Sequence, residues 1–179
     1  MRKNTWLVSL VSLLAIGLGG CGLIEFDLNE KVPEQRIQGS LLSGVLPSFL
    51  PSPVPLSLDV QAASKAMGTG PVTAASLKSL TFAITATAMP SGDSDDFDFV
   101  RSIDVYVESR KQGSTLPRVK IADLPSHGSG DKQLSLHTYA EVNLLPYINE
   151  GCEISATATG TAPPDDVTFD GQVVVRAKL

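Results

Sequence analysis

Aspartates are crowded in two short stretches of the sequence, and their spacing suggests metal chemistry. The first stretch, 93–98, reads Asp-Ser-Asp-Asp-Phe-Asp. Its carboxylates are Asp93, Asp95, Asp96 and Asp98. The carboxylates of the second stretch, 163–171, are Asp165, Asp166 and Asp170. Hard cations such as Ca²⁺ are held by several oxygen ligands at short spacing, so the two stretches predict a calcium site if they meet at one end of a fold.

The alternative is that both acidic stretches are solvated turns, because aspartate is a favoured turn residue. The first stretch is not an EF-hand. The glycine required at the sixth loop position is Asp98 here, and the glutamate required at the twelfth is Asp104. Calcium is the one cofactor that the sequence suggests, and no other is expected.

The segment 126–131, Ser-His-Gly-Ser-Gly-Asp, contains the residue types of a hydrolytic triad. Neighbours in a glycine-rich turn point in divergent directions, whereas a working triad is assembled from separate segments. The glycines around Ser129 also do not form the G-x-S-x-G elbow. The other histidine, His137, falls on the outward face of a predicted strand. We therefore expect no catalytic residues and no enzyme.

Residues 37–58 form an apolar, proline-rich stretch without a charged residue. Its prolines and glycines exclude a continuous helix, so it is not expected to span a membrane. The apolar side chains that need cover include Leu41, Leu42, Leu46, Phe49 and Leu50. The stretch is either a loop folded over one end of the domain or a surface for lipid, a hydrophobic ligand or a partner protein.

Alternation of apolar and polar residues with a period of two predicts the elements that must position these groups. Clear strands are expected at 80–85, 103–108, 134–137, 154–159 and 173–179, with weaker candidates at 24–32, 54–60 and 119–122. One short helix is expected near 143–150, capped by Asn143 and ended by Gly151. The pattern favours an all-β, antiparallel β-sandwich, immunoglobulin-like in the broad sense, with a β-barrel as the alternative.

The N-terminus has the three zones of an export signal. Arg2 and Lys3 are followed by a segment, 6–18, that is apolar apart from two serines, and the segment closes on Leu18-Gly19-Gly20-Cys21. Leu18, Gly20 and Cys21 resemble the lipobox of bacterial lipoprotein precursors, although Gly19 is a less usual choice at its position. The resemblance covers only residues 1–22.

The lipobox resemblance implies that residues 1–20 are a signal peptide and that Cys21 carries acyl groups after cleavage. Two or more acyl chains anchor a protein durably to a membrane. Gly22 follows the cysteine where an aspartate would mark inner-membrane retention in enteric bacteria, so the outer membrane is the expected location. Residues 21–179 are expected to form a single domain in which 23–60 is partly irregular. Cys152 would then be the one remaining thiol, free and packed as a small apolar residue.

The charge of the chain limits its partners. The formal net charge is −5, and cleavage after residue 20 removes Arg2 and Lys3 but no acidic residue. An acidic domain repels nucleic acid, so nucleic acid is not an expected partner. The first hypothesis is a membrane-tethered, non-catalytic structural or protein-interaction domain with a partner in the cell envelope. The alternatives are a binding module for a hydrophobic or glycan ligand and a calcium-dependent, adhesion-like domain.

Overall fold

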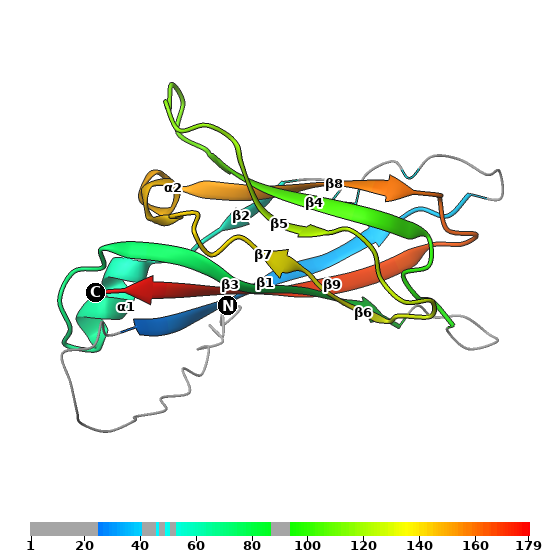
Figure 1. The fold of residues 1–179 in the computed structure, drawn as a ribbon, viewed down its shortest axis with the longest axis horizontal. Coiled ribbons are helices and arrows are strands. Elements are labelled where there is room, and N and C mark those ends of the chain that lie inside the picture. Colours follow the sequence, from blue (N-terminus) through cyan, green and yellow to red (C-terminus); the bar gives the residue numbers. More distant parts are fainter. Residues whose placement is uncertain (1–24, 41–45, 47–48, 51–52, 87–93) are drawn as a thin grey trace, which may run out of the picture.

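The computed structural model describes residues 25–40, 46, 49–50, 53–86 and 94–179, which form two facing antiparallel sheets (Figure 1). One sheet has the order β1 (Glu25–Ile37), β9 (Val167–Lys178), β3 (Ala74–Thr85) and β6 (Gln133–Ser135). The other has the order β2 (Val54–Leu56), β8 (Cys152–Gly160), β4 (Val100–Ser109), β5 (Val119–Leu124) and β7 (His137–Thr138). The sheets do not close on each other, so the predicted sandwich is confirmed over the barrel.

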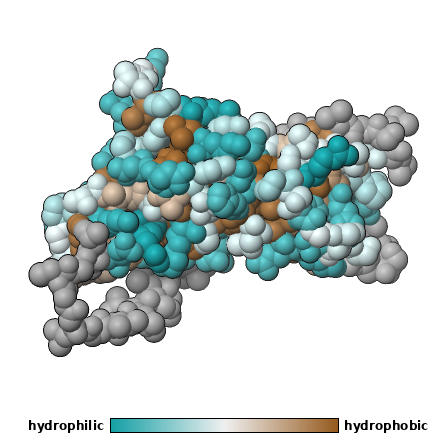
Figure 2. Space-filling view, viewed as in Figure 1, coloured by the Kyte–Doolittle hydropathy of each residue, from teal (hydrophilic) through white to brown (hydrophobic). Residues whose placement is uncertain are grey.

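The strands form where alternating side chains can be buried on one face. In β4, Ile103, Val105 and Val107 are buried, and the residues between them are only partly buried. The same pattern runs through β9, which pairs with both β1 and β3. Successive side chains of a strand point to opposite faces, so each sheet presents one apolar face to the other. Figure 2 shows hydrophobic residues between the sheets, with hydrophilic residues covering most of the visible surface.

Strand β1 is one edge of its sheet, because it pairs only with β9. It is longer than the predicted strand at 24–32, and its register shifts between Val32 and Gln35. Pro33 falls at this irregularity, where a residue without a backbone N–H is tolerated.

Two of the predicted strands are wrong in part. Residues 54–60 divide into β2 and a helix that was not predicted, α1 (Val60–Ala66), because the Asp59 carboxylate accepts a hydrogen bond from the Ala62 N–H at 2.8 Å and caps it. Residues 134–137 divide between the two sheets. Ser135 pairs with Thr81 of β3, whereas His137 pairs with Asp123 of β5, so the chain crosses from one sheet to the other.

The predicted short helix is α2 (Leu145–Glu150). Gly151 ends it with φ 76°, as expected. Asn143 is not the N-cap residue by backbone position, which is Leu144. Its side-chain oxygen still accepts hydrogen bonds from the N–H groups of Leu145 and of Ala75, each at 3.1 Å, and so joins the start of α2 to β3. Within the described ranges, neither helix has the length and apolar character needed to cross a membrane.

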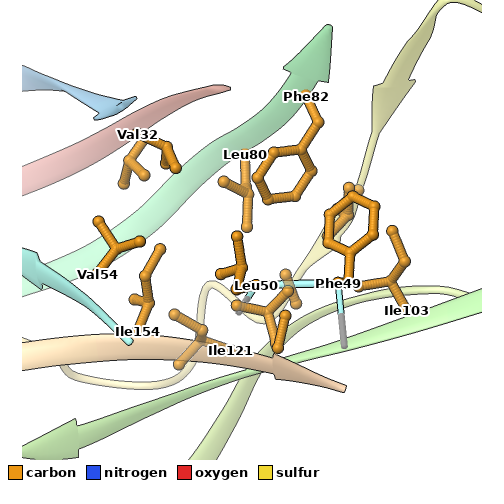
Figure 3. Close-up of a cluster of buried hydrophobic side chains, with 14 of the residues drawn as sticks. Val32, Phe49, Leu50, Val54, Leu80, Phe82, Ile103, Ile121 and Ile154 are labelled. Carbon is orange, nitrogen blue, oxygen red and sulfur yellow. The ribbon is translucent and has the colours of Figure 1, made fainter. Parts of the chain in front are cut away.

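The apolar stretch 37–58 contributes to the centre of the core. Leu46, Phe49 and Leu50 are buried, and Figure 3 shows Phe49 and Leu50 between the side chains of the two sheets. The Phe49 ring stacks on Phe169 with centroids 4.6 Å apart and meets Phe82 edge-on at 5.0 Å. Leu46, Phe49 and Leu50 are therefore core side chains, and the alternative that they form an exposed surface for a ligand or partner is wrong. Leu41 and Leu42 lie outside the described residues.

Replacing Phe49 with alanine should lower the free energy of unfolding by about 3–5 kcal/mol, because it removes a fully buried ring from between the sheets. Urea titration followed by circular dichroism measures the change. The matched control is Met67→Ala, at an exposed residue, which should change the stability by less than about 0.5 kcal/mol. A loss for Phe49→Ala as small as that of the control would contradict the placement of Phe49 in the core.

Candidate functional site

The first acidic stretch lies immediately before β4. Asp93 is outside the described residues, Asp95 is half-buried, and Phe97 is fully buried. The carboxylate of Asp98 accepts hydrogen bonds from the Gly130 N–H at 2.6 Å and from the Ser129 hydroxyl at 2.8 Å. These two donors, the Gly130 N–H first, hold the pKa of Asp98 below its ordinary value. Asp98 therefore fastens the segment before β4 to the 126–131 loop.

In the same stretch, the Asp96 carboxylate contacts the backbone two residues further along the chain. Its Oδ1 accepts a hydrogen bond from the Asp98 N–H at 3.0 Å. This is an aspartate turn, as expected if the acidic stretch is a turn and not a metal site.

The second acidic stretch begins in the loop between β8 and β9. The Asp166 carboxylate pairs with the Arg36 guanidinium and accepts a hydrogen bond from the Gly39 N–H at 2.8 Å. The hydrogen bond from Arg36, followed by that from Gly39, lowers the pKa of Asp166. The backbone of Asp165 approaches Gly39 so closely that a Cβ on Gly39 would lie 2.2 Å from the Asp165 carbonyl carbon. Gly39 thus permits the contact between the two segments.

Asp170 does not belong to this loop. The turn predicted over 163–171 ends early, because β9 begins at Val167, and Asp170 is an exposed strand residue paired with Ala83. Among the residues that the structure describes, no three His, Cys, Asp or Glu side chains come together in a way that could hold a metal ion. The carboxylates of Asp98 and Asp166 instead bind donors from other segments of the chain.

A hollow of about 380 Å³ opens at the end of the sandwich where β4 begins and β8 ends. It is lined by Asp98, Phe99, Val100, Arg101, Ser126, His127, Gly128, Ser129, Gly160 and Thr161. The His127 side chain is only 9% exposed. Its Nε2 lies 2.7 Å from the Val100 carbonyl oxygen, and its Nδ1 lies 2.7 Å from the Gly128 carbonyl oxygen. The ring therefore holds the 126–131 loop against the start of β4.

The residue types of a catalytic triad are present at this hollow, but their hydrogen bonds hold the 126–131 loop in place. The Ser129 hydroxyl donates to Asp98, and the Asp131 carboxylate accepts from the Gly128 N–H at 2.8 Å. A general-base histidine must turn one ring nitrogen to the nucleophilic hydroxyl. Both nitrogens of His127 face main-chain carbonyl oxygens instead. The arrangement can fix a loop, and it does not match the geometry of an activated serine.

A polar cluster that the sequence did not indicate lies on β5, β7 and the residue after β7. The Asp123 carboxylate accepts a hydrogen bond from the Tyr139 hydroxyl at 2.7 Å, and its other oxygen lies 3.2 Å from His137 Nδ1. The Tyr139 hydrogen bond is the main cause that lowers the pKa of Asp123, and the same contact raises the pKa of Tyr139. Lys120 joins the cluster through an ion pair with Asp123 at 3.9 Å and also pairs with Asp104 at 2.8 Å. His137 is 67% exposed, so this cluster is accessible to a partner.

An exposed aromatic ring could serve as a platform for a sugar, but Tyr106 and Tyr139 are only partly free. The guanidinium of Arg118 lies over the Tyr106 ring, 3.8 Å from its centroid. This cation–π contact covers one ring face that a sugar would use. Tyr139 packs edge-on against His137, with centroids 5.1 Å apart.

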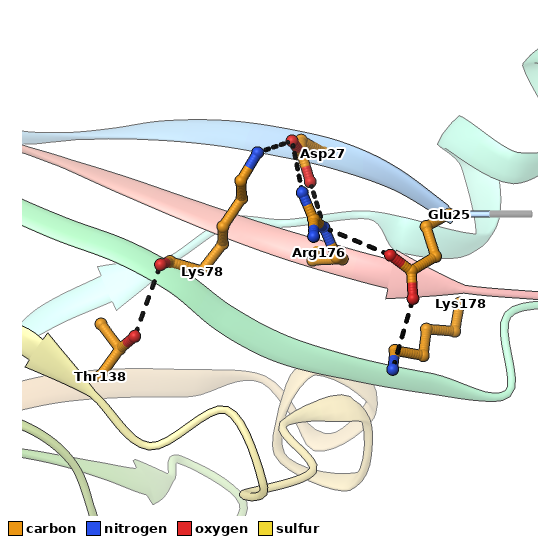
Figure 4. Close-up of polar contacts among 6 residues, drawn as sticks. All are labelled: Glu25, Asp27, Lys78, Thr138, Arg176 and Lys178. Atoms are coloured by element: carbon orange, nitrogen blue, oxygen red, sulfur yellow. Dashed lines mark hydrogen bonds and ion pairs between the residues drawn. The ribbon is translucent and has the colours of Figure 1, made fainter.

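A ladder of ion pairs crosses the outward face of the β1–β9–β3 sheet (Figure 4). Asp27 on β1 contacts Arg176 on β9 at 3.0 Å and also pairs with Lys78 on β3. Glu25 pairs with Lys178 at 3.3 Å. The hydrogen bond from Arg176 is the largest cause of the lowered pKa of Asp27. The ladder fixes the first residues of β1 to the end of β9.

The sequence matches no protein-family model and no curated protein. Among solved structures, the fold is similar to the capsid protein of BFDV, described as decameric, at 9% sequence identity and a TM-score of 0.39. The match covers 87% of this chain and 99% of that chain. A likeness this weak carries no argument about the function of this chain.

Cys152 should resist maleimide in the folded protein. It is a free, buried thiol, and burial raises its pKa to about 11, so little of the reactive thiolate forms at neutral pH. Mass spectrometry after a timed pulse at pH 7 should find Cys152 unlabelled in buffer and labelled in concentrated urea. Equal labelling rates in both conditions would contradict the buried position.

The Asp98 contacts should stabilise the fold in a pH-dependent way. Because the folded pKa lies below the ordinary value of 3.8, the contribution is fully present above that value and is lost as the pH falls through the lowered pKa. Asp98→Asn should therefore be less stable than the wild type at pH 7, and the difference should shrink on acidification. Urea titrations over the pH range measure it.

The neighbouring serines provide matched controls for this pH dependence. Ser129→Ala removes one donor to Asp98 and should reduce the effect, whereas Ser126→Ala should leave it unchanged, because no hydrogen bond joins Ser126 to Asp98. A pH dependence that is the same in the wild type and in Asp98→Asn would show that these hydrogen bonds do not stabilise the fold.

Proposed function

We propose that this chain is the precursor of an exported lipoprotein. Residues 1–20 are removed, and acyl groups on Cys21 hold the β-sandwich at a bacterial membrane. There it acts as a non-catalytic structural or protein-interaction domain. The observation that carries the proposal is the sequence Leu18-Gly19-Gly20-Cys21 at the end of a short apolar segment preceded by Arg2 and Lys3.

The position of the first strand is compatible with this processing. Every described element lies after residue 24, and β1 begins at Glu25. Cleavage before Cys21 would therefore remove none of the strands or core residues described above. The domain would follow its anchor after only a few residues, which is a short tether.

The proposed location is the outer membrane. Two or more acyl chains give durable attachment, whereas one chain binds only marginally. Gly22 stands where an aspartate would direct retention in the inner membrane of enteric bacteria. The proposed partner is another protein of the cell envelope, since the acidic charge of the chain disfavours nucleic acid.

A non-catalytic role is supported by the way in which the polar groups are used. Asp98, Asp166 and His127 each contact groups of other segments and fix loops at one end of the sandwich. The Asp123 cluster is exposed on a sheet face, where polar groups suit contact with a protein. The proposal of a hydrophobic ligand has less support, because Leu46, Phe49 and Leu50 fill the core.

Replacing the modified cysteine tests the proposal. In cells fed a radioactive fatty acid, Cys21→Ser should abolish lipid labelling of the protein and leave the uncleaved precursor on a gel. Cys152→Ala is the matched control, since it removes the other thiol and should preserve both labelling and cleavage. Normal processing of Cys21→Ser would overturn the proposed lipid anchor.

A further inference from the structure

We propose that one end of the sandwich, the α1 end, rests on the lipid surface. The α1 end consists of α1, the connection 67–73 to β3, the start of β1 and the end of β9, which lie together on the left in Figure 1. This inference rests on the proposed lipid anchor and adds an orientation and a contact surface to it.

The length of the tether decides which end faces the membrane. Glu25 is four residues after Cys21, and four extended residues span at most about 14 Å. Strand β1 has 13 residues, which extend for roughly 40 Å at the rise of a strand. The start of β1 is therefore held near the lipid, whereas the end of β1 can lie a full strand length away.

The chemistry of the α1 end fits a lipid surface. Met67, directly after α1, is 39% exposed and is the one large hydrophobic side chain that is exposed among the described residues. The acidic side chains of the α1 end are Glu25, Asp27 and Asp59, and its basic side chains are Lys65, Lys78, Arg176 and Lys178, so the basic groups outnumber the acidic ones in a chain whose net charge is negative. Anionic head groups repel carboxylates and attract lysine, and the carboxylates of Glu25 and Asp27 are already paired with basic side chains, so the α1 end can approach such head groups.

Another group of acidic residues lies at the opposite end. Asp98 and Asp131 lie in the loops around the start of β4, and Asp166 pairs with Arg36 at the end of β1. An orientation with the α1 end toward the membrane therefore also moves these carboxylates away from anionic lipid.

Met67 is held in a fixed position relative to the start of β1. Val60 and Val72, on either side of it in the chain, pack with Ala177 of β9, and Phe26 of β1 contacts the same cluster. The buried Ser64 hydroxyl is hydrogen-bonded to the Gly70 carbonyl oxygen, which closes the connection after α1. The ion pairs of Glu25 and Asp27 in turn fix the start of β1 to β9. The start of β1 and the exposed methionine thus belong to one packed unit.

The contact has a simple physical form. The flexible thioether of methionine adapts to irregular apolar surroundings. Interfacial protein segments bury their apolar side chains about 5–10 Å into the boundary between head groups and acyl chains. A single exposed methionine would bind weakly alone, so the covalent anchor supplies the affinity and Met67 sets the orientation.

An environment-sensitive fluorophore on a single new cysteine tests the orientation. The acylated protein, purified from cells after processing, is reconstituted in vesicles of phosphatidylethanolamine and phosphatidylglycerol, with the fluorophore on Met67→Cys. The control variant is Ser126→Cys, an exposed residue beside the hollow at the opposite end. Buried Cys152 is expected to stay unlabelled, and the wild type measures any background. The emission at position 67 should shift to the blue and be quenched by spin-labelled lipids, with neither change at position 126.

The outcomes separate this inference from the proposal on which it rests. If the acylated protein floats with the vesicles but the label at 67 stays in water, or the label at 126 is the one quenched, the orientation is wrong and the lipid anchor stands. If mass spectrometry finds no acyl group on Cys21 and the protein does not float, the anchor is overturned and this inference with it.

Discussion

The packing of Phe49 between the two sheets is the interaction on which most of the structure depends. Its ring contacts Phe82 of β3 and Phe169 of β9, and it also lies 6.2 Å from Phe97, measured between centroids. A residue from an irregular, proline-rich stretch thus joins strands of one sheet to the segment that leads into the other. Because Phe97 is fixed in this way, Asp98 faces the 126–131 loop, and that loop closes the end of the sandwich through His127.

The parts of the fold that the sequence predicts are those in which one face of a strand is buried. The alternation in β4 and β9 identifies them because a period of two matches the geometry of a half-buried strand. The same rule fails at Leu136, where regular alternation continues while the chain changes sheets, since both sheets bury their apolar side chains in one core. The sequence does not predict helix α1, because the start of this helix depends on the cap from Asp59 and the helix is too short for a clear helical period.

The candidate sites were harder to predict because their partners are distant in sequence. The spacing of the acidic residues suggested metal binding, yet Asp98 bonds to Gly130 and Asp166 to Arg36, which no local pattern reveals. The Asp123 cluster depends in the same way on the pairing of β5 with β7. Residue spacing limits which groups can meet, but tertiary pairing decides which of them do. For the apolar stretch 37–58, the sequence shows that the apolar side chains must be shielded from water, but it leaves open whether the core or a partner shields them.

The irregularity in β1 has a consequence for contacts between copies of the protein. A long unpaired edge strand can pair with the edge of another copy and so encourage intermolecular sheet growth. Pro33 interrupts the donors along the edge, the shifted register bends it, and the sequence from Glu25 to Ile37 carries charges of both signs. Such features discourage strand addition by neighbours. Strand β1 can therefore form the edge of its sheet without promoting aggregation.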